Sequence, residues 1–73
     1  MVEEIRKAIR AIPFVPFTVA ISDGRRLHVP TVDHVFLAPN GGSLHVYPDN
    51  DHPVWVSTLH VTSIEPDEKQ AVS

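Results

Sequence analysis

The sequence contains no cysteine, so disulfides and thiolate zinc sites are excluded. No apolar run approaches the roughly 20 residues that a membrane-spanning helix needs. The acidic start Met1-Val2-Glu3-Glu4 is not followed by an apolar segment, so no signal peptide is expected. Because disulfides are rare in reducing compartments, a chain without cysteine fits a cytoplasmic location.

The chain is also short, and its 73 residues provide one domain only. A domain of this size buries only about 60% of the surface that its unfolded chain exposes, so one copy should be marginally stable. Without cysteine, stability must come from a well-packed core, from self-association or from a histidine-based metal site. We predict a single domain over residues 1–65 and a disordered acidic tail over residues 66–73.

Positive charge is scarce, with six basic against nine acidic residues and a net charge of −3. Nucleic-acid-binding proteins usually display a basic surface, because neutralised phosphates supply much of their affinity. Apart from Lys69, the basic residues form one group within the first ten positions and a second at Arg25 and Arg26. RNA is therefore disfavoured as a partner but stays open, with Arg25, Arg26 and His34 as the candidate contacts.

Residues 2–12 have the apolar spacing of an amphipathic helix. Its predicted apolar stripe consists of Val2, Ile5, Ala8, Ile9 and Ile12. Pro13 should end the helix, because proline disfavours helical angles at the residue before it. Eleven residues are too few for a stable isolated helix, so the stripe must dock on the rest of the domain. The connector Pro13–Phe17 follows, and Phe14 and Phe17 are predicted to plug one end of the core.

Residues 17–30 predict a β-hairpin around Asp23 and Gly24. A two-residue turn would divide the apolar residues between the two faces of the sheet. A three-residue loop over residues 22–24 would pair Val19 with Leu27 and place the apolar residues on one face, so we predict this loop, with a bulge.

The remainder alternates short apolar runs with turn residues. Further strands are predicted over residues 32–38, with Val35-Phe36-Leu37 covered on both sides, over 44–47 and over 54–63, with a break near Thr58 and Leu59. The predicted fold is mostly β, with a short N-terminal helix followed by a five-stranded, antiparallel, strongly bent sheet.

Two stretches resemble the Sm motif, namely Phe17-Thr18-Val19-Ala20-Ile21-Ser22-Asp23-Gly24-Arg25 and Val56–Ile64. The first is similar to the strand–(Asn/Asp)-Gly–strand opening of that motif, and the second to the closing strands of its bacterial Hfq-like members. The chain also resembles a group of short bacterial proteins of unknown function. They share Pro-Phe-x-Pro-Phe, Asp-Gly-Arg and Val-Thr-Ser-Ile, here residues 13–17, 23–25 and 61–64.

The resemblance implies a small Sm-like or SH3-like barrel. Sm-like proteins form rings in which the last strand of one subunit pairs with the fourth strand of the next. This implies a homo-oligomer joined by strand edges, with contacts from Leu44, Val46, Tyr47, His60, Val61, Thr62 and Ile64. The Lys-His pair of the Hfq RNA site has no counterpart in Ser57-Thr58-Leu59, so the RNA activity does not follow from the fold.

No pattern in the chain predicts catalysis or a cofactor. The five histidines lack close metal-ligand spacing, Asp49-Asn50-Asp51 lacks the rest of a calcium loop, and hydroxyl residues around His60 fit ordinary strand positions. Trp55 and Tyr47 fit either the core or an interface. We therefore expect a non-enzymatic, self-associating scaffold or adaptor without bound metal, with a weak RNA-binding protein as the alternative.

Overall fold

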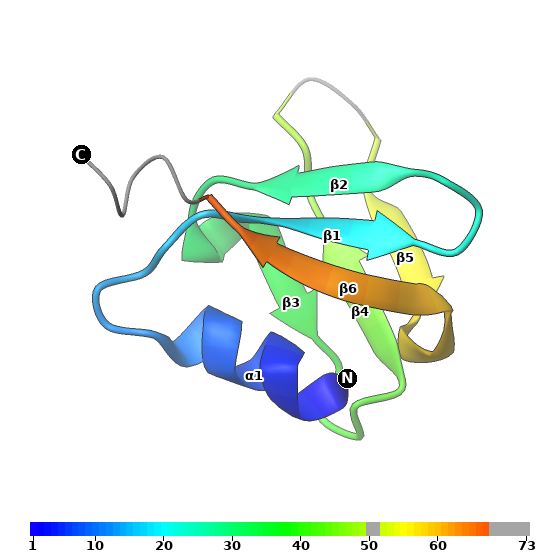
Figure 1. The fold of residues 1–73 in the computed structure, drawn as a ribbon, viewed down its shortest axis with the longest axis horizontal. Coiled ribbons are helices and arrows are strands. Elements are labelled where there is room, and N and C mark those ends of the chain that lie inside the picture. Colours follow the sequence, from blue (N-terminus) through cyan, green and yellow to red (C-terminus); the bar gives the residue numbers. More distant parts are fainter. Residues whose placement is uncertain (50–51, 68–73) are drawn as a thin grey trace.

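The computed structural model describes residues 1–49 and 52–67 of the chain. It consists of an N-terminal helix and six strands in two three-stranded antiparallel sheets (Figure 1). The elements, in chain order, are α1 (Val2–Arg10), β1 (Phe17–Ile21), β2 (Arg26–Val29), the 3₁₀ turn η1 (Val32–His34), β3 (Val35–Leu37), β4 (Ser43–Val46), β5 (Val54–Ser57), the 3₁₀ turn η2 (Thr58–His60) and β6 (Val61–Pro66). The first sheet has the order β2-β1-β6 and the second β3-β4-β5.

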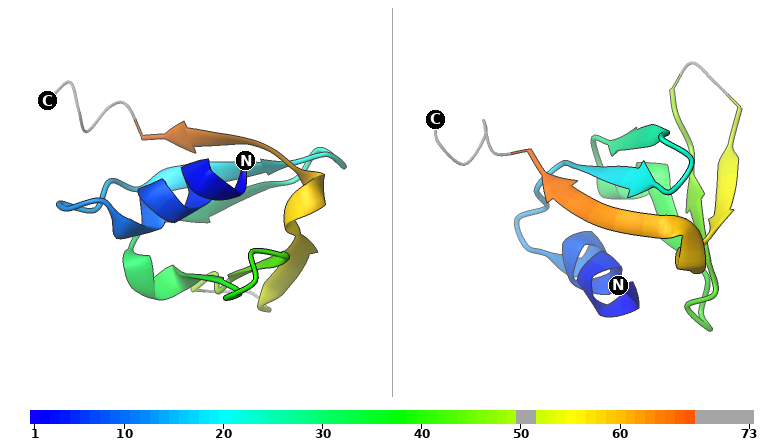
Figure 2. Two further views of the ribbon diagram at one scale, coloured as in Figure 1. Left: turned by 90° about the horizontal axis from the view of Figure 1, so that it is seen from below. Right: turned by 45° about the vertical axis from the view of Figure 1, so that its right-hand side comes forward.

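Helix α1 docks on the core as predicted, through Ile5, which is fully buried. The helix lies below β1 and β6 and beside β3, so that it covers one end of the space between the sheets (Figure 2). It ends at Arg10, earlier than predicted, because Ala11 is already extended. Ile12 is 96% exposed, so the prediction that it belongs to the apolar stripe is wrong.

The β1–β2 hairpin has the predicted register. Val19 pairs with Leu27 and Phe17 with Val29 across a three-residue loop closed by a 2.9 Å bond from Ile21 N to the Arg25 carbonyl. Gly24 has a φ of 98°, in the left-handed region that glycine tolerates best. The requirement that the alternating apolar residues share one face of the sheet therefore determines the length of the loop.

The prediction of one bent five-stranded sheet is wrong in strand number and in continuity. The predicted strand over residues 32–38 begins as the η1 turn, in which the Thr31 hydroxyl accepts the Asp33 N–H, and only its second part pairs with β4. The predicted strand over residues 54–63 is broken by η2 near Thr58, as the sequence indicated. After that turn the chain leaves β5 and pairs as β6 with β1. None of the six strands pairs with strands of both sheets, so the two sheets do not close into a barrel.

The core lies between the two sheets and is sealed by α1. Its largest fully buried side chains are Phe17, Ile5, Leu44, Val19, Val29 and Val46. Phe14 packs against this cluster, with its ring centroid 5.8 Å from that of Phe17, which confirms the predicted aromatic plug. The buried Thr58 hydroxyl donates to the Gly41 carbonyl at 2.8 Å and so satisfies both polar groups inside the fold.

The C-terminal boundary of the domain lies slightly beyond the predicted residue 65. Pro66 still pairs with Phe17, and Asp67 N donates to the Pro16 carbonyl at 2.8 Å. The rest of the predicted tail, residues 68–73, lies outside the described residues. In the described part of the chain, no helix has the length and apolar character needed to cross a bilayer.

Candidate binding surface

A row of planar side chains crosses the outer face of the second sheet. Phe36, His45 and Trp55 are direct cross-strand neighbours on β3, β4 and β5. The His45 and Trp55 rings stack with centroids 4.7 Å apart, and the Phe36 and His45 rings meet edge to face with centroids 5.7 Å apart. Trp55 is 69% exposed and Phe36 49% exposed. We call these three residues the aromatic row.

The polar neighbour of the aromatic row is Ser43, whose hydroxyl lies 3.0 Å from His45 Nε2. That distance would suit a nucleophile and its base, but such a pair also needs a group that orients the second ring nitrogen. Among the described residues no carboxylate or carbonyl bonds to His45 Nδ1, and neither Ser43 nor His45 lines one of the three main cavities. The serine therefore fixes the plane of the imidazole, which favours stacking on Trp55.

Beside the aromatic row, strand β5 is a free edge of the second sheet. The bond from Thr58 N to the Gly42 carbonyl continues the β4–β5 ladder. In an antiparallel ladder every second residue bonds to its neighbour strand, so the N–H and C=O groups of Trp55 and Ser57 point away from β4. A cavity of about 300 Å³ opens along this edge, between Trp55 and Arg25. Leu59, just beyond the strand, is 91% exposed. An unpaired backbone edge thus lies between two large exposed apolar side chains.

The three predicted nucleic-acid contacts each face a carboxylate. Arg25 Nε lies 2.8 Å from Asp23 Oδ2. The backbone N–H of Arg25, together with its guanidinium group, holds the pKa of Asp23 below its ordinary value.

Arg26 pairs with Glu65 across the first sheet. The hydrogen bonds from the Arg26 guanidinium lower the pKa of Glu65, so this carboxylate keeps its charge. The partners of both arginines therefore remain anionic at neutral pH.

His34 is held between two groups, with Nε2 2.6 Å from Asp49 Oδ1 and Nδ1 2.7 Å from the Thr31 hydroxyl. His34 and Arg26 line one cavity of about 470 Å³, but Asp49 lines it with them. The structure therefore brings two of the three predicted contacts together without creating an unbalanced positive surface.

The predicted oligomer contacts lie mainly on two strands, β4 in the middle of the second sheet and β6 at the edge of the first. Leu44 and Val46 are fully buried on β4, which is paired on both sides, so the prediction of a free edge there is wrong. Tyr47 follows that strand and is exposed. The remaining predicted contacts are His60, Val61, Thr62 and Ile64, which lie in η2 and in the edge strand β6. Because the chain has an extra strand, β5 occupies the edge that was assigned to residues 44–47.

Sequence reasoning missed most of the aromatic row. It predicted Val35-Phe36-Leu37 to be covered on both sides, which is wrong at Phe36, and it left Trp55 open between core and interface. His45 alternates with Leu44 and Val46, which is typical of the outer face of a strand. The cross-strand registers needed to align Phe36, His45 and Trp55 come from pairings that local patterns do not determine.

No metal centre is formed by the described residues, since none of their histidines and carboxylates gather in groups of three or more. Of the loop Asp49-Asn50-Asp51, only Asp49 is described, and it bonds to His34. Comparison with known proteins adds no relative: no family model matches the chain, and no curated protein and no solved structure is found to be similar to it.

Proposed function

We propose that this chain is a non-enzymatic, self-associating scaffold or adaptor module in which β5 of one copy pairs with β6 of the next. The observation that carries the proposal is the free edge of β5, with Trp55 at 69% and Leu59 at 91% exposure beside it. An exposed edge next to large apolar side chains invites pairing with another chain unless it is protected. We include a cytoplasmic location in the proposal, because the chain lacks cysteine.

The order of the elements supports an Sm-like or SH3-like topology that is open between its two sheets. A helix precedes the β1–β2 hairpin, a 3₁₀ turn precedes the last strand, and that strand returns to β1. In Sm-like rings the joining edges are the last strand and the strand before it. In this chain those strands are β6 and β5, and each is the terminal strand of its own sheet.

A second copy fits the β5 edge better than an unrelated partner does, because the chain itself carries a matching second edge. Strand β6 begins with Val61 and includes Ile64, whereas Glu65 and Pro66 protect its far end by charge and by the missing N–H. The pairing is therefore limited to residues 61–64, about the length of β5. Because the two edges differ, the contact is head-to-tail. Such contacts form a ring when the rotation that relates one copy to the next brings the last copy back to the first.

The test is the oligomeric state of the wild-type protein and two matched variants, measured by light scattering during gel filtration. Trp55→Lys places a charge on the β5 edge without disturbing a buried group. Ile12→Lys makes the same kind of change at a 96% exposed position just before the connector. We expect an oligomer for the wild type and for Ile12→Lys, and a folded monomer for Trp55→Lys. A wild-type mass of 8.1 kDa at high micromolar concentration would refute the proposal.

RNA binding by an Sm-like protein is the alternative function, and the ion pairs of Arg25 and Arg26 weigh against it. Both arginines would have to leave a carboxylate before they could neutralise a phosphate. Salt-sensitive retention of single-stranded RNA by the wild-type protein in a filter-binding titration would favour this alternative.

A further inference from the structure

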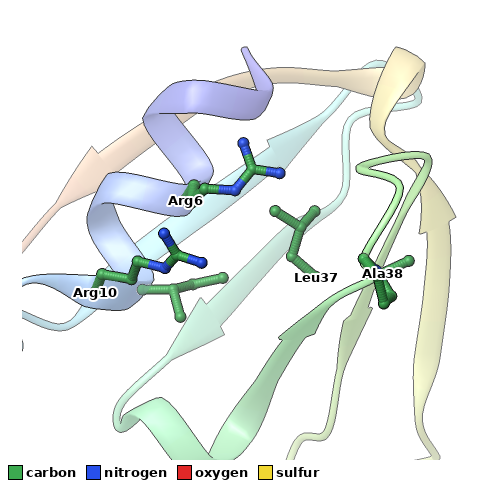
Figure 3. A pocket seen from close by; sticks show the side chains of 6 residues that line it. Arg6, Arg10, Leu37 and Ala38 are labelled. Carbon is green, nitrogen blue, oxygen red and sulfur yellow. The ribbon is translucent and has the colours of Figure 1, made fainter.

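A small cavity of about 160 Å³ lies between α1 and the end of β3. Its lining comes from two sides, with Arg6, Ile9 and Arg10 on the helix and Leu37, Ala38 and Pro39 at the end of the strand. Figure 3 shows the side chains of Arg6 and Arg10 extending from the helix toward Leu37 and Ala38. This cavity is far from the β5 edge in the fold and shares no residue with the aromatic row.

Arg10 gives one side of the cavity a positive charge that no ion pair among the described residues balances, and Arg6 beside it is paired with an exposed carboxylate. Arg6 Nη1 bonds to Glu3 Oε2 at 2.9 Å, but that carboxylate belongs to a strongly exposed side chain. In the described residues Arg10 has no carboxylate within ion-pair distance. Like charges four residues apart on a helix destabilise it. An anion between Arg6 and Arg10 would remove that repulsion and accept charge-assisted hydrogen bonds from both.

The opposite side of the cavity combines an apolar surface with an unpaired backbone. Two backbone bonds continue the β3–β4 ladder at its ends. One runs from Ala38 N to the Ser43 carbonyl and the other from Tyr47 N to the His34 carbonyl. By antiparallel alternation the N–H and C=O groups of Leu37 then point away from β4. Strand β3 is the end strand of its sheet, so this edge has no other strand beside it.

We propose that this cavity is a binding site for an acidic peptide in extended conformation, with one carboxylate held between Arg6 and Arg10 and the peptide backbone paired with Leu37. Addition of a strand to a sheet edge gives affinity through main-chain hydrogen bonds, and a pocket beside the edge gives specificity. The planar guanidinium groups match the geometry of a carboxylate.

The size of the cavity limits what it can hold. A water molecule occupies about 30 Å³ in the liquid, so 160 Å³ corresponds to roughly five heavy atoms. That is one carboxylate on a short side chain, and it is well below the roughly 300–1,000 Å³ of cofactor and drug-sized pockets. The rest of the peptide would therefore lie outside the cavity, along β3.

The test uses the full chain labelled with ¹⁵N and two capped peptides, Ac-Thr-Val-Glu-Val-Thr-NH₂ and the same peptide with glutamine in place of glutamate. We expect the glutamate peptide to shift the amide signals of Leu37 and Ala38 and the Nε–H signal of Arg10 in a saturable way. A charge-assisted hydrogen bond contributes about 1.5–3 kcal/mol, so the glutamine peptide should bind roughly ten- to a hundredfold more weakly.

Two variants of the same helix separate the site from general charge attraction. Arg10→Gln should weaken binding of the glutamate peptide about tenfold or more. Lys7→Gln removes an equal charge outside the cavity and should leave binding within about twofold, because exposed charges are screened. Equal losses in both variants, or no shift at Leu37, would overturn the proposal. Inorganic phosphate that binds as tightly as the glutamate peptide would also overturn it, because a bare anion site would then explain the data.

Discussion

Replacing Ile5 with alanine removes the only fully buried side chain of α1 and tests whether the helix is an integral part of the core. Ile5 belongs to the same buried cluster as Phe17 of the first sheet and Leu44 of the second. Removing a buried isoleucine side chain to alanine typically costs 2–5 kcal/mol, through lost burial and the cavity left behind. A domain of this length has a total stability of only about 4–11 kcal/mol. The substitution should therefore remove about a fifth of the stability or more.

The assay is equilibrium unfolding in urea, followed by circular dichroism and supported by thermal melting. A loss of about 3 kcal/mol corresponds to a decrease in Tm of roughly 12–24 °C for a domain of this size. The measurement is made in the Trp55→Lys background, so that subunit association does not contribute to the stability. The matched control is Ile12→Ala, which makes the same substitution at a 96% exposed position and should change the stability by less than about 0.5 kcal/mol.

The reasoning would be refuted if Ile5→Ala and Ile12→Ala had the same small effect. That result would mean that α1 leaves the core at little cost and that the two sheets are stable without it. A loss of helical signal in Ile5→Ala before the strands unfold would equally contradict a single cooperative core.

Two further outcomes follow from the structure. Gly41→Ala should lower the free energy of unfolding in urea more than Gly24→Ala does. Both glycines have a positive φ, but only at position 41 would the new methyl group approach another side chain closely, at 3.1 Å from Val2 Cγ1. Equal losses in the two variants would contradict this close approach. The pH dependence of the stability should reveal the contribution of the Arg26–Glu65 pair. The pKa of Glu65 is lower in the folded chain than its ordinary value of 4.5. The stability from this pair is therefore present above pH 4.5 and is lost as the pH falls through the pKa of the folded state. Urea midpoints between about pH 6 and about pH 2 should therefore fall more steeply for the wild type than for Glu65→Gln, and parallel curves would show that the pair contributes nothing.

The parts of the fold that depend on local pattern could be predicted from the sequence. The alternation of apolar residues around Val19 and Leu27 favoured a three-residue loop in the first hairpin, because a two-residue turn would divide these residues between the two faces of the sheet. The break near Thr58 and Leu59 was also predicted. The structure attributes it to the Ser57 hydroxyl, which accepts the Leu59 N–H and stabilises a 3₁₀ turn.

The parts that depend on distant pairing could not be predicted. Strand β6 pairs with β1 across some forty residues of sequence, for example Val19 with Ile64, and nothing local identifies that partner. The edge position of β5 follows from this pairing, as does the exposure of Trp55. The candidate surface was therefore hidden from sequence analysis because it depends on strand order.

The bond from the Thr58 hydroxyl to the Gly41 carbonyl lies beside the backbone bond from Thr58 N to the Gly42 carbonyl, so two adjacent bonds join the same two regions. Gly41 lies against Val2 at the start of α1, and Thr58 begins the turn that carries the chain from one sheet to the other. A residue change at either position thus alters the support of both the helix and the sheet crossing. Loss of the hydroxyl at position 58 would leave the buried Gly41 carbonyl without this partner, whatever residue stands at position 41.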